Sequence, residues 1–378
     1  MAIPQRFSRR ALLLSSAAAM GCRRPPKATP FSGYCFVANQ DGRSVAVVDL
    51  TNFHRWPPIP LDAAPSLVLA HPSRPRAYVL LPDAGSVCEL DAASLSVSRR
   101  VSAGSQLASM RLAGESLWIL ARNPAALVQI SLDSFQPRHR VHLSAIPEDF
   151  DLSQDGRAAI VCPRDRTVIM ASLDRAAVER TIRIPAEPTS VCFQLDGKQI
   201  LVGSRPDRSI TIFDVPTGRT IVRLPLPLEP RRFCFNSDGG QLFLTGNGMD
   251  AVAVVYPYQT EVAETILAGH APDGMATTGP EAGSYLLVTN PSSNSVTVLN
   301  IDDRRLVSVV GVGAEPREIL ITPDNQYALV LNQKSGDLAV IRLYSLDNPA
   351  RAHRYKSAAL FTLVPVGARP VSAAVVKL

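Results

Sequence analysis

The sequence predicts an all-β fold built from one repeated unit, and three observations support this. Two aliphatic runs around a polar loop recur roughly every 40 to 44 residues. Apolar and β-branched residues alternate within the runs, as in strands, and no amphipathic helix of convincing length occurs. Tight-turn pairs recur at one position of the unit, namely Asp155-Gly156, Asp196-Gly197, Asp238-Gly239 and Asp324-Asn325.

Eight copies of this unit can be aligned. The clearest copies start at Gly33, Ser284 and Gln326, and weaker copies start at Arg76, Ser116, Ala158, Gln199 and Gln241. The fifth copy contains four strand candidates in order: ILVGS, SITIFDV, RTIVRLPL and RRFCFNSDG. A single four-stranded sheet cannot bury both of its faces, whereas sheets stacked radially can. The sequence therefore predicts a β-propeller of four-stranded antiparallel blades.

The number of blades follows from counting the fourth strands. Candidates lie near Pro65, Leu107, Glu148, Pro188, Pro230, Pro272, Pro316 and Pro370. The last candidate, RPVSAAVVKL, has no copy after it, and the copy at Gly33 has no fourth strand before it. We expect these two ends to share one blade, giving eight blades in a single domain over residues 33–378. Seven blades remain the alternative if a weak copy, such as the third, is an insertion.

The N-terminal segment is typical of an export signal. It has a basic start with Arg9 and Arg10, an apolar run from Ala11 to Met20, and small residues before Cys22. The run is too short for a membrane-spanning helix. SRRALLL resembles a twin-arginine signal and AMGC resembles a lipobox. We expect a signal over residues 1–22, a linker over 23–32, and an exported protein that is either periplasmic or anchored to the membrane through a lipid on Cys22.

The net charge gives no sign of a nucleic-acid partner. The chain has 39 basic and 33 acidic residues, a formal charge of +6. Residues 1–27 hold six of the basic residues and no acidic one, so the remainder carries 33 of each. The basic character therefore belongs to the targeting segment. We expect no nucleic-acid binding, no membrane contact except through the anchor, and a monomer.

The six cysteines do not form a metal or redox motif. None are spaced as CxxC, and all except Cys22 lie in apolar strand-like runs, where a free thiol acts as a small buried hydrophobe. Cys192 and Cys234 occupy matching repeat positions, so a disulfide between them stays open.

Three segments carry a family resemblance. YLLVTNPSSNSVTVLN, GYCFVANQDGRSVAVVDL and VGVGAEPREILITPDNQYALVLN resemble the YVTN-type β-propeller repeat. Related propellers include surface-layer and periplasmic proteins, lactonases and the haem-d1 domain of a nitrite reductase, and seven blades are usual among them. The repeat specifies a fold rather than a function. The residues Asn39, Asn290 and Asn332 are expected to shape their loops through side-chain to backbone hydrogen bonds.

Arginines supply the candidate binding site. Arg122, Arg164 and Arg205 each follow a turn glycine by eight residues, which predicts a basic arc on three consecutive blades. A second set lies beside the prolines that link blades and should be nearer the channel mouth: Arg231, Arg317 and Arg369. Such residues bind anions through charge-assisted hydrogen bonds. The alternative is solvated loop arginines paired with carboxylates, with Asp165, Asp207, Glu187, Glu229 and Glu315 as the nearest partners.

The catalytic candidates form a weaker set. His270 and Asp273 in GHAPDGMA could act as a base and its orienting group, with Glu229 as a further carboxylate, but no nucleophile motif accompanies them. No metal-ligand spacing or cofactor motif occurs, so we expect no metal and no cofactor. The sequence favours a non-enzymatic binding or scaffold module of the bacterial envelope, with an envelope protein or a small anionic ligand as its partner. The alternative is a lactonase-like hydrolase acting on a sugar lactone.

Overall fold

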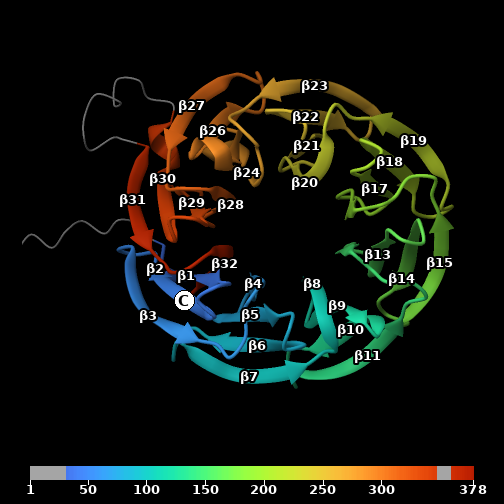
Figure 1. Ribbon diagram of the computed structural model, residues 1–378, viewed down its shortest axis with the longest axis horizontal. Helices are drawn as coiled ribbons and strands as arrows, with labels where there is room; N and C mark the ends of the chain where they lie inside the picture. The colour runs from blue at the N-terminus through green and yellow to red at the C-terminus, as the bar shows by residue number, and fades with distance from the viewer. Residues whose placement is uncertain (1–30, 347–358) are drawn as a thin grey trace, which may run out of the picture.

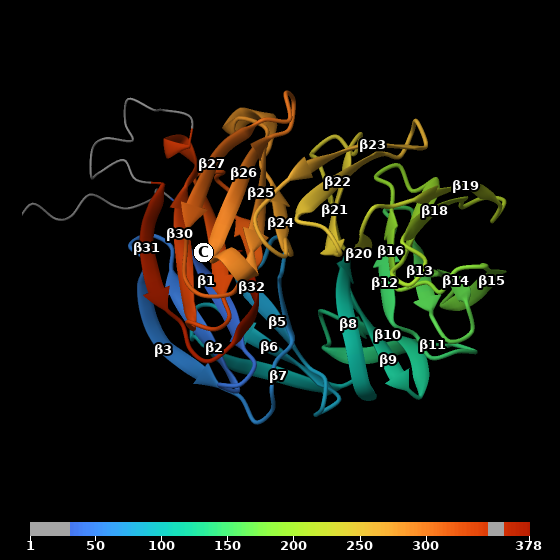
Figure 2. The ribbon, with the colours of Figure 1, turned by 45° about the horizontal axis from the view of Figure 1, so that its top comes forward.

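The computed structural model describes residues 31–346 and 359–378, which form a ring of eight four-stranded antiparallel sheets (Figure 1). The strands run between the two faces of the ring (Figure 2). The predicted β-propeller with eight blades is confirmed. Seven blades is wrong, because the third copy forms a complete blade and not an insertion. The expected signal, with Arg9, Arg10 and Cys22, lies outside the described residues.

Blade 1 comes from both ends of the chain, and blades 2 to 4 follow in chain order. From the centre outward, blade 1 holds β32 (Pro370–Lys377), β1 (Gly33–Asn39), β2 (Ser44–Asp49) and β3 (His54–Pro60). Blade 2 holds β4 (Leu67–Ala70), β5 (Arg76–Leu81), β6 (Ser86–Asp91) and β7 (Ser96–Ser102). Blade 3 holds β8 (Ser105–Ala113), β9 (Ser116–Asn123), β10 (Ala125–Ser131) and β11 (Gln136–His142). Blade 4 holds β12 (Asp149–Leu152), β13 (Arg157–Cys162), β14 (Thr167–Ser172) and β15 (Ala177–Arg183).

The other four blades follow in chain order. Blade 5 holds β16 (Ser190–Phe193), β17 (Gln199–Ser204), β18 (Ser209–Asp214) and β19 (Thr220–Pro225). Blade 6 holds β20 (Glu229–Phe235), β21 (Leu242–Asn247), β22 (Ala251–Tyr256) and β23 (Glu261–Leu267). Blade 7 holds β24 (Met275–Thr277), β25 (Tyr285–Asn290), β26 (Ser295–Asn300) and β27 (Leu306–Gly311). Blade 8 holds β28 (Pro316–Ile321), β29 (Tyr327–Asn332), β30 (Asp337–Arg342) and β31 (Leu360–Pro365). Three 3-10 turns complete the described chain: η1 (Pro280–Ala282), η2 (Pro291–Ser293) and η3 (Leu343–Ser345).

The hydrophobic core lies between neighbouring blades. The two middle strands of each blade are buried on both faces, so they consist of almost continuous apolar runs, such as YLLVTN in β25. Outer strands face solvent: every residue of β15 except one is exposed. One core cluster, for example, joins Tyr78 and Leu80 of blade 2 to Leu117 and Ile119 of blade 3. Each blade therefore depends on its neighbours for burial.

The C-terminal strand closes the ring as predicted. β32 pairs antiparallel with β1, with Tyr34 opposite Val376 and Phe36 opposite Ala374. At the Asn39 end of β1, the amide of Gln40 donates to the carbonyl of Arg369 (2.9 Å). This end belongs to the loop face, which we define as the face formed by the links between blades and the turns between second and third strands. At the other end of β1, Leu378 N donates to Ser32 O (3.1 Å), on the opposite face.

The five described cysteines are free thiols. Cys192 and Cys234 lie on β16 and β20, the innermost strands of adjacent blades, and do not form the disulfide that the sequence left open. Within residues 31–346 and 359–378, no helix is long and apolar enough to cross a membrane.

Candidate functional site

A cavity of about 1120 Å³ opens on the loop face, and we call it the mouth cavity. Residues of blades 1, 6 and 8 and of the link before blade 7 line it, together with the turn that follows β29. Six of its side chains are cationic: Arg55, Arg231, Arg232, Arg317, Lys334 and Arg369. Three are acidic: Asp41, Asp273 and Glu315. The excess of cationic side chains makes the cavity suited to an anion.

Asp273 is the fixed centre of this cavity. Its side chain is only 4% exposed and lies between two arginines, with Arg317 Nη1 at 2.9 Å and Arg232 Nε at 3.4 Å. Its backbone is also fixed, because its amide donates to Thr289 O (3.0 Å) and its carbonyl accepts from Thr245 Oγ1 (2.5 Å). A buried carboxylate needs such compensation. Asp273 therefore holds two guanidinium groups at the cavity wall.

Arg317 is the most firmly positioned of the cationic groups. Besides Asp273, it contacts Glu315 Oε1 through Nε (2.9 Å) and Nη2 (2.8 Å). Burial alone would lower the pKa of Arg317, but its bonds to Glu315 and Asp273 outweigh burial and raise that pKa above its ordinary value. The group stays charged at any pH at which the protein is folded.

Three of the remaining cationic groups, Arg231, Lys334 and Arg369, are available to a ligand. Within the described chain, Arg231 and Lys334 form no ion pair. Arg369 Nη1 lies 3.7 Å from Asp41 Oδ1, and both side chains are more than half exposed, so this pair is weak. A bound anion would therefore find unpaired charges beside the fixed Arg317.

A second compartment of about 550 Å³ adjoins the first. The two share Arg231, Asp273 and Arg317, so these three residues form the wall between them. Backbone and amide groups of the turn after β21, including Asn247 and Gly248, line the far side.

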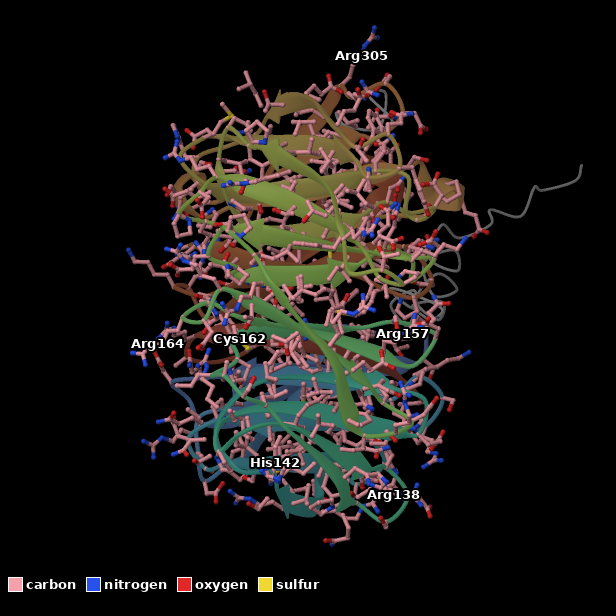
Figure 3. The ribbon with its side chains drawn as sticks, turned by 90° about the vertical axis from the view of Figure 1, so that its right-hand side faces the viewer. Arg138, His142, Arg157, Cys162, Arg164 and Arg305 are labelled. Atoms are coloured by element: carbon pink, nitrogen blue, oxygen red, sulfur yellow. The ribbon has the colours of Figure 1, made fainter. Side chains whose placement is uncertain are left out.

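The structure separates the two predicted arginine sets. Arg231, Arg317 and Arg369 do gather at the mouth cavity. Arg122, Arg164 and Arg205 lie at second-to-third-strand turns of blades 3, 4 and 5, away from the cavity. Arg122 pairs with Glu148 (2.7 Å), while Arg164 extends from one edge of the ring, with Arg157 toward the opposite edge (Figure 3). Whether either set binds a ligand stays a prediction.

The catalytic candidates are not assembled. The proposed pairing of His270 with Asp273 is wrong, because His270 Nδ1 contacts Asp250 Oδ2 (2.5 Å) and Asp273 is occupied by arginines. Glu229 instead lies 3.4 Å from Arg208. Among the described residues, no group of three or more His, Cys, Asp or Glu side chains could hold a metal ion.

Sequence reasoning missed Arg55, Arg232 and Lys334 at this site. Arg55 belongs to the outermost strand of blade 1, and only ring closure brings it toward residues of blade 8. Arg232 directly follows a predicted residue, but a register shift in β20 turns it toward Asp273 and toward Glu318 Oε2 (3.6 Å). Burial raises the pKa of Glu318, and the charge of Arg232 opposes that shift.

Comparison with known families gives a partial match. Residues 276–348, which cover blade 7 from the second residue of β24 and the first three strands of blade 8, match the family model described as lactonase, 7-bladed beta-propeller. No curated protein matches the chain. The match agrees with the propeller fold and covers too little of the chain to show membership of the family.

Solved structures show the same fold at low sequence identity. Dihydro-heme d1 dehydrogenase NirN is 14% identical, with a TM-score of 0.76 over 94% of this chain and 78% of that chain. AztD from Citrobacter koseri is 10% identical, with a TM-score of 0.67 over 92% and 98%. Kuenenia stuttgartiensis hydrazine synthase is 18% identical, with a TM-score of 0.60 over 74% and 95%. At these identities the likeness shows the fold alone.

Proposed function

We propose that this protein is an exported, non-enzymatic propeller of the bacterial envelope that binds an anionic ligand in the mouth cavity. One observation carries the proposal: six cationic side chains face three acidic ones around a cavity of about 1120 Å³. Asp273 holds Arg317 and Arg232 in place at the cavity wall. Arg231 and Lys334 form no ion pair among the described residues, so their charges are available to a ligand. The N-terminal segment, which resembles a twin-arginine export signal with a lipobox at Cys22, supports the location in the periplasm or at the membrane.

The test is calorimetric titration of the purified protein with citrate and with inorganic phosphate at low ionic strength. The double variant Arg231→Ala, Arg369→Ala should weaken binding at least about tenfold, since each charge-assisted hydrogen bond contributes about 1.5–3 kcal/mol. Arg317 is left in place because Asp273 depends on it.

The matched control removes two arginines from the same face but away from the cavity, Arg164→Ala with Arg205→Ala. It should bind as the wild type does, and both double variants should keep the wild-type melting temperature. Absence of binding of either probe at millimolar concentration would contradict the proposal, and so would equal weakening by the control.

A second candidate function is hydrolysis of a sugar lactone, which the partial match over residues 276–348 favours. Of the three candidate catalytic residues only Asp273 lines the mouth cavity, and it is held by two arginines. A hydrolase should hydrolyse gluconolactones faster than they hydrolyse spontaneously. Asp273→Asn should reduce the rate to the spontaneous one. A rate equal to the spontaneous one in the wild type would exclude this function for these substrates.

A further inference from the structure

A groove of about 330 Å³ lies at the rim between blades 6 and 7; it shares no lining residue with the mouth cavity, and Asp250 lines both the groove and the second compartment. We call it the outer groove. Its walls include Leu267, Leu306 and Val309, which are 80%, 60% and 57% exposed and are the most exposed large apolar side chains of the described chain. Its polar lining includes Asp250, His270, Ser293 and Ser295. β23 and β27, which carry the apolar walls, are neighbours around the rim (Figure 1).

Three other blades place an arginine at the corresponding position. β7, β11, β19 and β27 each have a single buried residue near the strand end: Val101, Val141, Leu224 and Val310. The residue directly before it is Arg100 in blade 2, Arg140 in blade 3 and Arg223 in blade 5. In blade 7 this residue is Val309. Blade 7 therefore lacks the cationic side chain that three other blades place over this position.

Two of these arginines show what a guanidinium contacts there. Arg100 Nε donates to Ser86 Oγ (3.0 Å), and the same guanidinium pairs with Asp62. Arg223 Nε donates to Ser209 Oγ (3.2 Å), and its Nη2 lies 3.2 Å from Asp207 Oδ1. In both blades the guanidinium joins a nearly buried serine hydroxyl to a carboxylate.

The groove of blade 7 also contains a serine and a carboxylate, without the arginine. Ser295 is the first residue of β26, as Ser86 is of β6 and Ser209 is of β18, and it too is nearly buried. Asp250, in the β21–β22 turn of the preceding blade, supplies the carboxylate, whereas Asp62 lies in the link before blade 2. Hydrogen bonding from Ala271 N, and then from His270, lowers the pKa of Asp250, which keeps it ionised.

We propose that the outer groove binds an arginine side chain presented by a partner protein. The guanidinium would lie between Ser295 and Asp250, and the aliphatic part of the side chain would cover Leu306 and Val309. The open edge of β27 favours a protein over a free small molecule. β27 is the edge strand of its sheet and has no charged residue, whereas β7, β11, β15 and β19 all carry arginines that would repel such a segment.

The test measures fluorescence anisotropy of two labelled, capped peptides of alternating threonine and valine with the full-length protein. One peptide has a central arginine and the other has citrulline, its uncharged isostere. The arginine peptide should bind at least about tenfold more tightly, because the guanidinium meets an ionised carboxylate. Asp250→Asn should remove this preference, and Val309→Arg should block the groove from within and abolish binding.

Val309→Thr is the matched control, because Thr181 and Thr265 occupy this position in blades 4 and 6. It should bind as the wild type does. Equal binding of the two peptides, absence of binding, or unchanged binding by Val309→Arg would each overturn the proposal. Val309 lines neither the mouth cavity nor the second compartment, so Val309→Arg should bind citrate as the wild type does. Citrate titration of this variant therefore distinguishes a failure of this proposal from a failure of the proposed function.

Discussion

Two carboxylates accept hydrogen bonds from backbone amides at the unpaired inner edge of the neighbouring blade. Asp149 Oδ2 accepts the amide of Val191 (3.3 Å), and Asp151 Oδ2 accepts the amide of Phe193 (2.8 Å). The acceptors lie on β12 and the donors on β16, which are innermost strands of adjacent blades. Such strands have an unpaired edge, so a side-chain acceptor from the neighbouring blade replaces the missing strand.

These carboxylates give a pH-dependence with a definite sign. Burial raises the pKa of Asp149 and of Asp151, and the charge of Arg111 and the backbone amides oppose that rise. The folded state then binds protons more tightly than the unfolded chain, so these groups stabilise the fold at low pH, and this contribution is lost as pH rises through the raised pKa values. Asparagine keeps the oxygen acceptor without the charge.

The melting temperature of the double variant Asp149→Asn, Asp151→Asn, minus that of the wild type, should therefore increase with pH. The increase is expected between about pH 4, the ordinary Asp pKa, and pH 7. Thermal melts at intervals across this range check it, with the exposed Asp302→Asn as the control. A decrease in this difference over the same pH range would contradict the raised pKa values of Asp149 and Asp151.

The loop asparagines were predictable from the repeat. Asn39 Nδ2 donates to Val366 O (2.9 Å), and Asn290 Oδ1 accepts from Gly269 N (3.0 Å). Both bonds reach the link that precedes the blade, as expected for side chains that shape these loops. Asn332 differs, because its amide contacts the carboxylate of Asp337 (2.6 Å). The repeat motif thus predicts that these asparagines form hydrogen bonds within their loops. Whether the partner is a backbone group or a carboxylate depends on the neighbouring side chain.

At the scale of elements, strand identity could be predicted and outer-strand geometry could not. The middle strands follow the aliphatic runs closely, as β25 and β26 do for YLLVTN and SVTVLN. Outer strands carry register shifts against their neighbours, for example in β7, β19 and β27. Each shift inserts a residue and reverses the faces of those beyond it. The equivalence of Val309 with Arg100 and Arg223 is therefore visible only once the pairing is known.

At the scale of the whole molecule, closure was predictable and the site was only partly so. Counting strand candidates was sufficient to join β32 to β1 and to give eight blades. The mouth cavity joins Arg231 and Arg317, which share the repeat position after a linking proline and were predicted to lie there, to Arg55 and Arg232, which were not. Their meeting depends on ring closure and on side-chain pairing with Asp273, and neither leaves a local pattern in the sequence.

Closure also predicts the effect of truncation. Deleting residues 370–378 removes β32, which includes the buried side chains of Ala374 and Val376. Burying each large aliphatic side chain contributes about 1.5–3 kcal/mol, and the deletion also leaves β1 without a neighbour. We expect a fall in melting temperature of about 10 °C or more, or aggregation. Thermal melts and size-exclusion chromatography check this, with deletion of Leu378 alone as the control, and a monomeric truncated protein of wild-type stability would contradict it.

The contact between Leu378 and Ser32 has a practical consequence for orientation. Both residues lie at the Gly33 end of β1, whereas the mouth cavity opens at the Asn39 end. Seven residues of extended chain separate these two ends, roughly 20 Å. A support, a label or a lipid joined ahead of Ser32 or after Leu378 therefore attaches to the back of the ring. Held in this way, the protein presents the mouth cavity outward.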